Sequence, residues 1–119
     1  MLPSAAIIQA DITRQLDRER LLAVAPHLYG LVVLAGDPAR VSDPALFEGA
    51  IERSYEVNYL GPILLARETT DRMRATNTPG AIVLISSMQA NALFAGSTAY
   101  AAQKAALDFA SLIWPHLMV

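Results

Sequence analysis

The chain of 119 residues contains no cysteine, and Lys104 is the single lysine among its nine Lys and Arg residues. The lack of cysteine excludes disulfides, thiolate chemistry and metal sites built on cysteine. No apolar run reaches the roughly 18 residues that a membrane span needs. The first residues also lack the basic segment and the long apolar stretch of a signal peptide. We therefore expect a cytoplasmic protein with no membrane partner.

Charge is scarce as well. The net charge is −2 and charged residues make up 17% of the chain, whereas about 25% is typical. Without a basic patch, nucleic acid is not an expected partner. Hydrophobic residues make up 54% of the chain, so we expect one domain over residues 1–119 that covers part of its apolar surface with another subunit or with further chain.

The pattern of apolar residues predicts strands that alternate with helices. Predicted buried strands lie at residues 5–10, 30–36 and 81–85, and predicted helices at residues 13–25, 43–75 and 98–114. Uninterrupted apolar strands that alternate with helices are typical of a parallel sheet covered on both faces. In such α/β sheets the ligand lies beyond the carboxyl ends of the strands.

The ends of these helices carry recognisable signals. Thr13 is a predicted N-cap of the first helix, and Pro26 closes it. Asp43 followed by Pro44 predicts the start of the second helix. Pro115 is expected to end the third helix.

Tyr100 precedes Lys104 by four residues in the last predicted helix. This spacing places both side chains on the same face of a helix. A fixed positive charge lowers the pKa of a neighbouring phenol from its ordinary value of about 10. Such a tyrosine can exchange protons with an alcohol or a ketone near neutral pH. Tyr100 and Lys104 could also form an ordinary surface pair on this helix, so the interpretation depends on the surrounding motifs.

Four motifs occur in a characteristic order. They are Leu34-Ala35-Gly36-Asp37, Asn58-Tyr59-Leu60-Gly61-Pro62, Ile85-Ser86-Ser87 and Tyr100 with Lys104. In order and spacing they resemble the short-chain dehydrogenase/reductase family, and the resemblance runs from Asp11-Ile12 to the last helix. The resemblance implies an incomplete Rossmann-like (doubly wound) parallel α/β sheet, with about three strands alternating with three helices.

The resemblance also implies roles for four catalytic residues. Tyr100 would be the general acid/base, and Lys104 would lower its pKa and bind the ribose of the nicotinamide cofactor. Ser87 would polarise the carbonyl of the substrate, although a serine at this place is also a common turn cap. Asn58 would hold a water in a proton relay. The activity implied is hydride transfer between NAD or NADP and a carbonyl or alcohol substrate.

The cofactor contacts implied by the resemblance extend beyond Tyr100 and Lys104. Asp11 would contact the adenine, the neighbouring Ile12 would also bind the cofactor, and Ala35 and Gly36 would pack against the adenosine side of the cofactor. Asp11 is also a simple helix-capping residue. We assign no metal ligand.

Pro62 offers a physical reason for the role of Asn58. A proline has no N–H, so the main-chain carbonyl of Asn58, four residues earlier, loses its helical partner. An ordered water that reaches toward Lys104 would satisfy this carbonyl.

Parts of the family pattern have no counterpart in the 119 residues. The six glycines never form the Gly-x-x-x-Gly-x-Gly turn that cradles the cofactor pyrophosphate, and about one helix follows Lys104. The sequence therefore resembles the central portion of such an enzyme. The strand at residues 5–10 would either pair directly with the strand at residues 30–36 or keep a native-like place with exposed edges, and we favour the second arrangement.

Two other functions are open to this sequence. A truncated, non-catalytic remnant of the family would act as an interaction or oligomerisation module, and we expect a homo-oligomer through the helices 45–75 and 98–114. A phospho-receiver domain has a similar length and alternation, but it needs an acidic cluster at its first strand and a lysine at a strand end. Lys104 lies in a predicted helix instead.

Overall fold

The computed structural model describes residues 5–92 and 95–117. Two strands, β1 (Gly30–Val33) and β2 (Ala81–Leu84), pair in parallel with Gly30 beside Ala81 and Val33 beside Leu84. The helices are α1 (Gln15–Ala23), α2 (Phe47–Tyr55), α3 (Gly61–Ala75) and α4 (Thr98–Leu117). Short 3-10 helices η1 (Pro44–Leu46) and η3 (Met88–Ala90) precede α2 and α4, and a π-helical segment η2 (Glu56–Leu60) joins α2 to α3. The predicted α/β class with a parallel sheet is confirmed.

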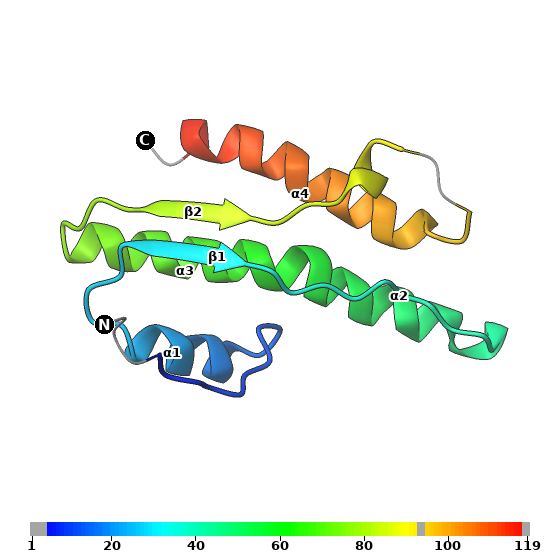
Figure 1. Ribbon diagram of the computed structural model, residues 1–119, viewed down its shortest axis with the longest axis horizontal. Helices are drawn as coiled ribbons and strands as arrows, with labels where there is room; N and C mark the ends of the chain where they lie inside the picture. Colours follow the sequence, from blue (N-terminus) through cyan, green and yellow to red (C-terminus); the bar gives the residue numbers. More distant parts are fainter. Residues whose placement is uncertain (1–4, 93–94, 118–119) are drawn as a thin grey trace.

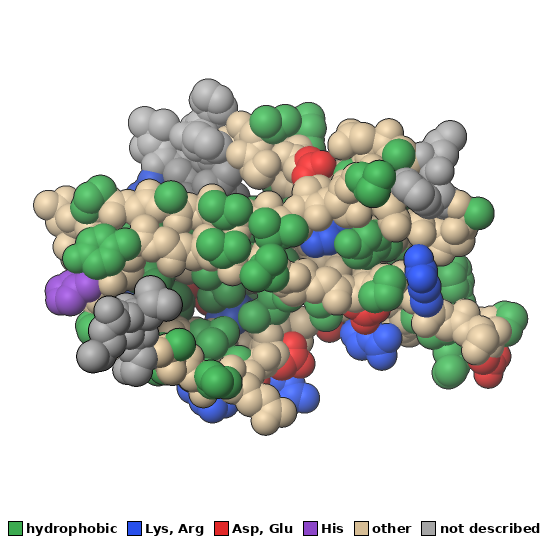
Figure 2. Space-filling model, in the orientation of Figure 1, with side chains coloured by type: hydrophobic (Ala, Val, Ile, Leu, Met, Phe, Trp, Pro, Cys, Tyr) green, Lys and Arg blue, Asp and Glu red, His purple; other side chains and the backbone are tan. Residues whose placement is uncertain are grey.

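The helices cover one face of the sheet only. In Figure 1 the two strands pass in front of α3, with α1 below them and α4 above them in the view. The core forms where Leu22, Val33 and Leu65 meet, and Leu31 and Leu84 pack against them. Apolar side chains of the other face stay exposed; they are Val32, Leu34, Val83 and Ile85. Figure 2 shows hydrophobic side chains gathered over this uncovered part of the strands.

The predicted strand at residues 5–10 is wrong. These residues form no strand, so the sheet has two strands rather than three. A strand is defined by hydrogen bonds to a neighbour, and an apolar run that finds no neighbour stays unpaired. Direct pairing with β1 therefore does not occur, and Ile7 remains 98% exposed.

The boundaries of two helices also differ from the prediction. Thr13 does not cap α1; its hydroxyl donates to the Asp11 carboxylate at 2.7 Å, and Arg14 occupies the cap without a side-chain bond. Pro115 does not end α4, which continues to Leu117. The proline φ angle suits a helix, so one proline near the end removes a hydrogen bond without stopping the last turn.

The long helix predicted at residues 43–75 is present as an unbroken run of helical turns of three kinds. Asp43 caps its start as expected, because its carboxylate accepts the N–H of Ala45 at 2.9 Å. In η2 the helix widens, and the N–H of Gly61 donates to the carbonyl of Glu56, five residues earlier. Pro62, which follows, has no N–H to continue the ordinary pattern. The widened turn therefore lies directly before the proline.

Gly61 allows the segment before α1 to approach the long helix. A Cβ at this position would lie 2.9 Å from the carbonyl oxygen of Glu56 and 3.2 Å from that of Ile12. Both neighbours are main-chain atoms, so neither can rotate away. The contact sets how close residues 11 and 12 lie to α3.

We expect Gly61→Ala to destabilise the chain by about 1–3 kcal/mol, because overpacking against main chain forces backbone shifts. Gly49→Ala in α2 is the matched control, since a Cβ there meets nothing within 4 Å. The control should stabilise the chain by about 0.5–1 kcal/mol through helix propensity. Urea unfolding of both variants measures the two effects. Equal stability changes at the two positions would contradict the close approach.

Candidate functional site

The predicted motifs meet at one edge of the sheet. Ala35 and Gly36 follow β1, and Ser86 and Ser87 follow β2. Because the two strands are parallel, their carboxyl ends lie at the same edge. The segment after β1 contacts η2 and the segment after β2 leads to η3 and α4, so this edge also carries Asn58 and Lys104.

Asn58 is fully buried, and its side chain clamps the loop after β1. Its Oδ1 accepts the N–H of Asp37 at 2.7 Å, and its Nδ2 donates to the carbonyl of Asp37 at 2.6 Å. The same Nδ2 donates to Oε1 of Gln103 in α4 at 2.8 Å. The side chain is therefore committed to protein partners, and the water on its main-chain carbonyl stays a prediction.

Asp37 belongs to one of the predicted motifs, but the sequence predicts no role for it. Its carboxylate accepts the N–H of Ala39 at 2.8 Å and the Nε of Arg53 at 2.8 Å. The hydrogen bond from Ala39, followed by the Arg53 guanidinium, lowers the pKa of Asp37 below its ordinary value. This turn holds Ala39 at a φ of 55°, in the left-handed region that is unusual for a residue with a Cβ.

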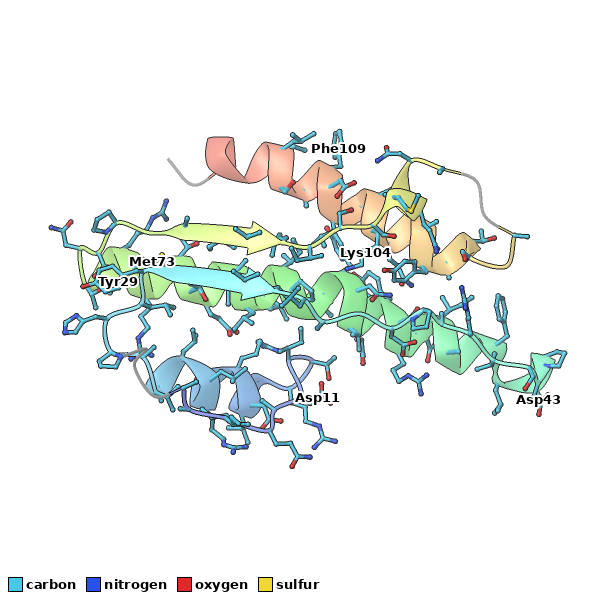
Figure 3. All side chains as sticks on the ribbon, in the orientation of Figure 1. Asp11, Tyr29, Asp43, Met73, Lys104 and Phe109 are labelled. Carbon is cyan, nitrogen blue, oxygen red and sulfur yellow. The ribbon has the colours of Figure 1, made fainter. Side chains whose placement is uncertain are left out.

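Lys104 is buried, with 3% of its surface exposed, and its Nζ donates to the carbonyl of Ile85 at 2.9 Å. Figure 3 shows it between α4 and the segment that leaves β2. The Nζ lies 5.9 Å from the centre of the Tyr100 ring, which is within the range of a cation–π contact. The predicted pairing of the phenol and the ammonium on one helix face is therefore present. Burial lowers the pKa of Lys104, and the charge of Asp108 partly opposes this effect.

Ser87 and Tyr100 are half-buried. The Oγ of Ser87 caps η3 by accepting the N–H of Gln89 at 3.2 Å. A hydroxyl that accepts one bond still has its own hydrogen to donate, so the cap leaves Ser87 able to bind a ligand oxygen. Tyr100 lines a small cavity of about 100 Å³, shared with Pro38 and Ala39 of the loop after β1.

Asp11 and Ile12 lie in the segment before α1, and Ile12 lines a hollow of about 330 Å³ together with Ala35 of the segment after β1. Figure 3 shows Asp11 beyond α1, far from Lys104. The Asp11 carboxylate accepts the hydroxyl and the N–H of Thr13, and these bonds lower its pKa. The carbonyl of Ile12 accepts Nη1 of Arg18 at 2.9 Å, and the Nε of this buried arginine donates to the Glu68 carboxylate at 3.0 Å. Arg18 and Glu68 were missed because they are 50 residues apart in the chain.

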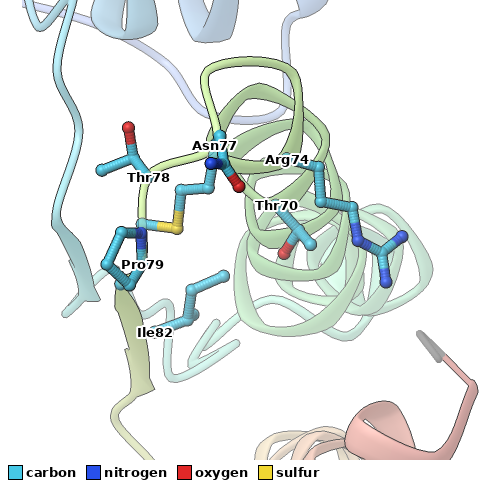
Figure 4. Close-up of a pocket in the computed structure, with 8 residues that line it drawn as sticks. Thr70, Arg74, Asn77, Thr78, Pro79 and Ile82 are labelled. Atoms are coloured by element: carbon cyan, nitrogen blue, oxygen red, sulfur yellow. The ribbon is translucent and has the colours of Figure 1, made fainter.

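A hollow of about 580 Å³ lies at the opposite, amino-terminal end of β2, and none of the predicted site residues lines it. In Figure 4 the Arg74 guanidinium points away from Pro79 and Ile82. The polar groups that line the hollow therefore do not converge on one ligand position, and the hollow is not a candidate active site.

Among the described side chains of residues 5–92 and 95–113 no group of three or more His, Asp or Glu residues is placed to hold a metal ion. No helix in the same residues is long and apolar enough to cross a membrane.

Comparison with known proteins gives one consistent result. The family described as short chain dehydrogenase matches residues 2–112. L-xylulose reductase of Caenorhabditis elegans is 36% identical over 87 residues, which cover 71% of this chain and 35% of that protein. The chain therefore spans about a third of the length of this curated relative.

Solved structures give the same picture. A short chain dehydrogenase/reductase family protein matches with a TM-score of 0.74 at 30% identity, over 90% of this chain and 45% of that chain. A 7α-hydroxysteroid dehydrogenase complexed with NADH and 7-oxo glycochenodeoxycholic acid matches with a TM-score of 0.74 at 26% identity, over 89% of this chain and 43% of that chain. The chain thus spans less than half the length of these structures.

The buried position of Lys104 predicts its titration. Because burial penalises the charged form, its pKa in the folded chain lies below the value of about 10.4 in the unfolded chain. Between these two values the unfolded state binds more protons, so the free energy of unfolding should rise with pH across this window. Below the folded pKa of Lys104, the cost of burying its charge lowers the free energy of unfolding by its full amount.

Labelling with ¹³C-lysine would test this prediction without assignment, since the chain has one lysine. The single ε-carbon resonance should titrate below the ordinary pH range of a lysine. The free energy of unfolding of the wild type minus that of Lys104→Met, both measured in urea, should rise with pH. A midpoint at the unfolded value would contradict the buried position.

Proposed function

Because the chain belongs to the short-chain dehydrogenase/reductase family, we propose that it carries the proton-transfer site of an NAD(P)-dependent oxidoreductase. The substrate class is a carbonyl compound or the corresponding alcohol. The observation that carries the proposal is the ammonium of Lys104, fixed by the Ile85 carbonyl within 5.9 Å of the Tyr100 ring centre. The site belongs to a single partial Rossmann-like domain over residues 1–119.

The residues at this edge suit a nicotinamide cofactor. The Lys104 Nζ has three donors and uses one for Ile85, so two remain for the hydroxyls of a ribose. Ala35 and Gly36 present main chain at the same edge, and Asp11 with Ile12 would face the adenine. A bound nicotinamide supplies or accepts the hydride. The choice between NAD and NADP stays open.

Tyr100 moves the proton. In reduction its phenol donates to the carbonyl oxygen of the substrate, and in oxidation the phenolate accepts the proton of the alcohol. The ammonium of Lys104 lies 5.9 Å from the centre of this ring, where it would stabilise negative charge that develops on the phenol oxygen during the transfer. The Ser87 hydroxyl donates to the same substrate oxygen and stabilises the charge that develops there.

Asn58 acts through its main chain. Its side chain is occupied by Asp37 and Gln103, and Pro62 supplies no N–H to its carbonyl. A water on that carbonyl would link Lys104 to solvent, as the sequence predicts.

The first test is fluorescence titration of the purified chain with NADH and NADPH, with circular dichroism as the check of folding. We expect Tyr100→Phe to change the affinity by less than about twofold, because the phenol acts on substrate. Lys104→Met should weaken binding by about tenfold, since a charge-assisted hydrogen bond contributes roughly 1.5 kcal/mol or more.

Arg67→Met is the matched control, because it removes a cation from an exposed position of α3. An equal loss of cofactor affinity in the Arg67 variant would mean that the loss in Lys104→Met comes from the change in net charge alone. A folded chain that binds neither cofactor would reject the proposed site.

A second function is favoured by the uncovered sheet face. Parallel sheets normally bury both faces, and Val32, Leu34, Val83 and Ile85 leave one face apolar and exposed. Self-association would cover it. The sequence favours a homo-oligomer through the helices 45–75 and 98–114 instead, and Phe109 and Leu112 of α4 are also exposed.

Sedimentation velocity distinguishes the two surfaces. If the sheet face associates, Val32→Glu with Val83→Glu should shift the chain toward its monomer mass of 12.8 kDa, whereas Phe109→Glu with Leu112→Glu should not. The reverse pattern would assign association to α4. A wild-type monomer at all concentrations would reject the oligomerisation module.

A further inference from the structure

Three buried polar side chains connect α4 to the long helix. Ser54 and Asn58 are fully buried and Gln103 is 8% exposed. Burial of an amide or hydroxyl is costly unless each polar atom finds a hydrogen-bond partner. The proton chemistry proposed above uses the carbonyl of Asn58 and leaves Ser54 and Gln103 without a role.

The hydrogen bonds define the orientation of each amide. Asp37 presents both an N–H and a carbonyl to Asn58, so the Oδ1 and Nδ2 of Asn58 are determined. Nδ2 has a second hydrogen, and it needs an acceptor, which is Oε1 of Gln103 at 2.8 Å. The Nε2 of Gln103 then faces Oγ of Ser54 at 2.9 Å, and Ser54 donates to the carbonyl of Ile51 at 3.0 Å.

These bonds form one continuous path from the loop after β1 to α4. Among the residues whose side chains the structure describes, every hydrogen bond between α4 and the α2–η2 run is made by Gln103. Gln103 directly precedes Lys104 and follows Tyr100 by three residues. A rotation or shift of α4 would therefore break this path and move both residues of the proposed site.

We infer that Gln103 is a positioning residue, which together with Ser54 sets the rotation and axial position of α4 so that Lys104 reaches the Ile85 carbonyl and Tyr100 lies beside it. The catalytic consequence rests on the proposed function, whereas the geometric one does not. An apolar residue at position 103 would fill the same space and hold α4 by packing alone. It would leave the second hydrogen of Asn58 Nδ2 without an acceptor, while the first stays on the Asp37 carbonyl, so the two helices would separate or rotate to admit water.

The single lysine gives a direct measurement. In a chain labelled with ¹³C-lysine, the one ε-methylene resonance reports the surroundings of Lys104. We expect Gln103→Met, which keeps the length of the side chain, to move this resonance toward that of a free lysine. Ser54→Ala should move it part of the way. The double variant should match Gln103→Met alone, because both changes break one path.

Arg18→Met is the control, since it breaks the partly buried ion pair between the buried Arg18 of α1 and Glu68 of α3 and leaves α4 untouched. It should lower the stability of the chain, as loss of one partner of a buried pair does, while the Lys104 resonance stays in place. Spectra are compared at a temperature where circular dichroism shows each variant folded. If Gln103→Met does not fold, Ser54→Ala alone decides the result.

An unchanged Lys104 resonance in Gln103→Met or in Ser54→Ala would overturn the inference, and so would an equal change in Arg18→Met. Titration of the same variants with NADH separates this inference from the proposed function. If wild type does not bind NADH, the proposed function fails and the resonance still decides the role of Gln103. If wild type binds, Gln103→Met should lose about as much affinity as Lys104→Met, roughly tenfold.

Discussion

The side chain of Asn58 is the constraint on which the candidate site depends. It pairs with both main-chain groups of Asp37, at 2.7 and 2.6 Å, and thereby fixes the loop that leaves β1. To reach that loop and α4 together, it must point inward from a helix that also runs past the sheet. The widened turn of η2, completed by the Gly61 N–H, provides this direction. Pro62 then makes the ordinary hydrogen-bond pattern unavailable at the same place.

The one-sided sheet is the second constraint. Helix α3 lies behind β1 and β2, and α1 packs on the same core through Leu22, while the other face of the sheet exposes Leu34 to 73%. Hydrophobic burial is the main favourable contribution to folding, and a two-stranded sheet with one bare face has little of it. The solved relatives in which this chain covers 43–45% of the length contain more chain than the part matched here. In the described residues the apolar side chains of this face are therefore left exposed to solvent.

Local signals in the sequence predicted the local parts of the fold. The cap at Asp43, the apolar runs of β1 and β2, and the shared helix face of Tyr100 and Lys104 all depend on residues within a few positions of one another. The strand at residues 5–10 was predicted from the same kind of signal and is absent, because pairing depends on a neighbour elsewhere in the chain. The stop at Pro115 failed since one proline costs a helix a single bond near its end.

The polar supports of the site could not be predicted for a related reason. Gln103 bonds to Asn58 and Ser54, which lie 45 and 49 residues earlier, and Arg18 bonds to Glu68 50 residues later. A glutamine or arginine on a predicted helix is of a residue type that usually lies on the solvent-exposed face. Nothing in its immediate sequence marks it as buried. Only the packing of one helix on another reveals the partner. Asp37 was visible as part of a motif, yet its four bonds to Asn58, Ala39 and Arg53 appear only in the folded chain.

The position of Lys104 explains why this one cation is a lysine. Burial disfavours its charge and lowers its pKa, so the ammonium needs compensation from the few acceptors within reach. The Ile85 carbonyl satisfies one of its three N–H groups, which leaves two for other acceptors. A guanidinium carries five N–H donors in a rigid plane, and this confined place offers too few acceptors to satisfy them. A compact, rotatable ammonium meets both demands, because it can be desolvated on one side and still donate on the other.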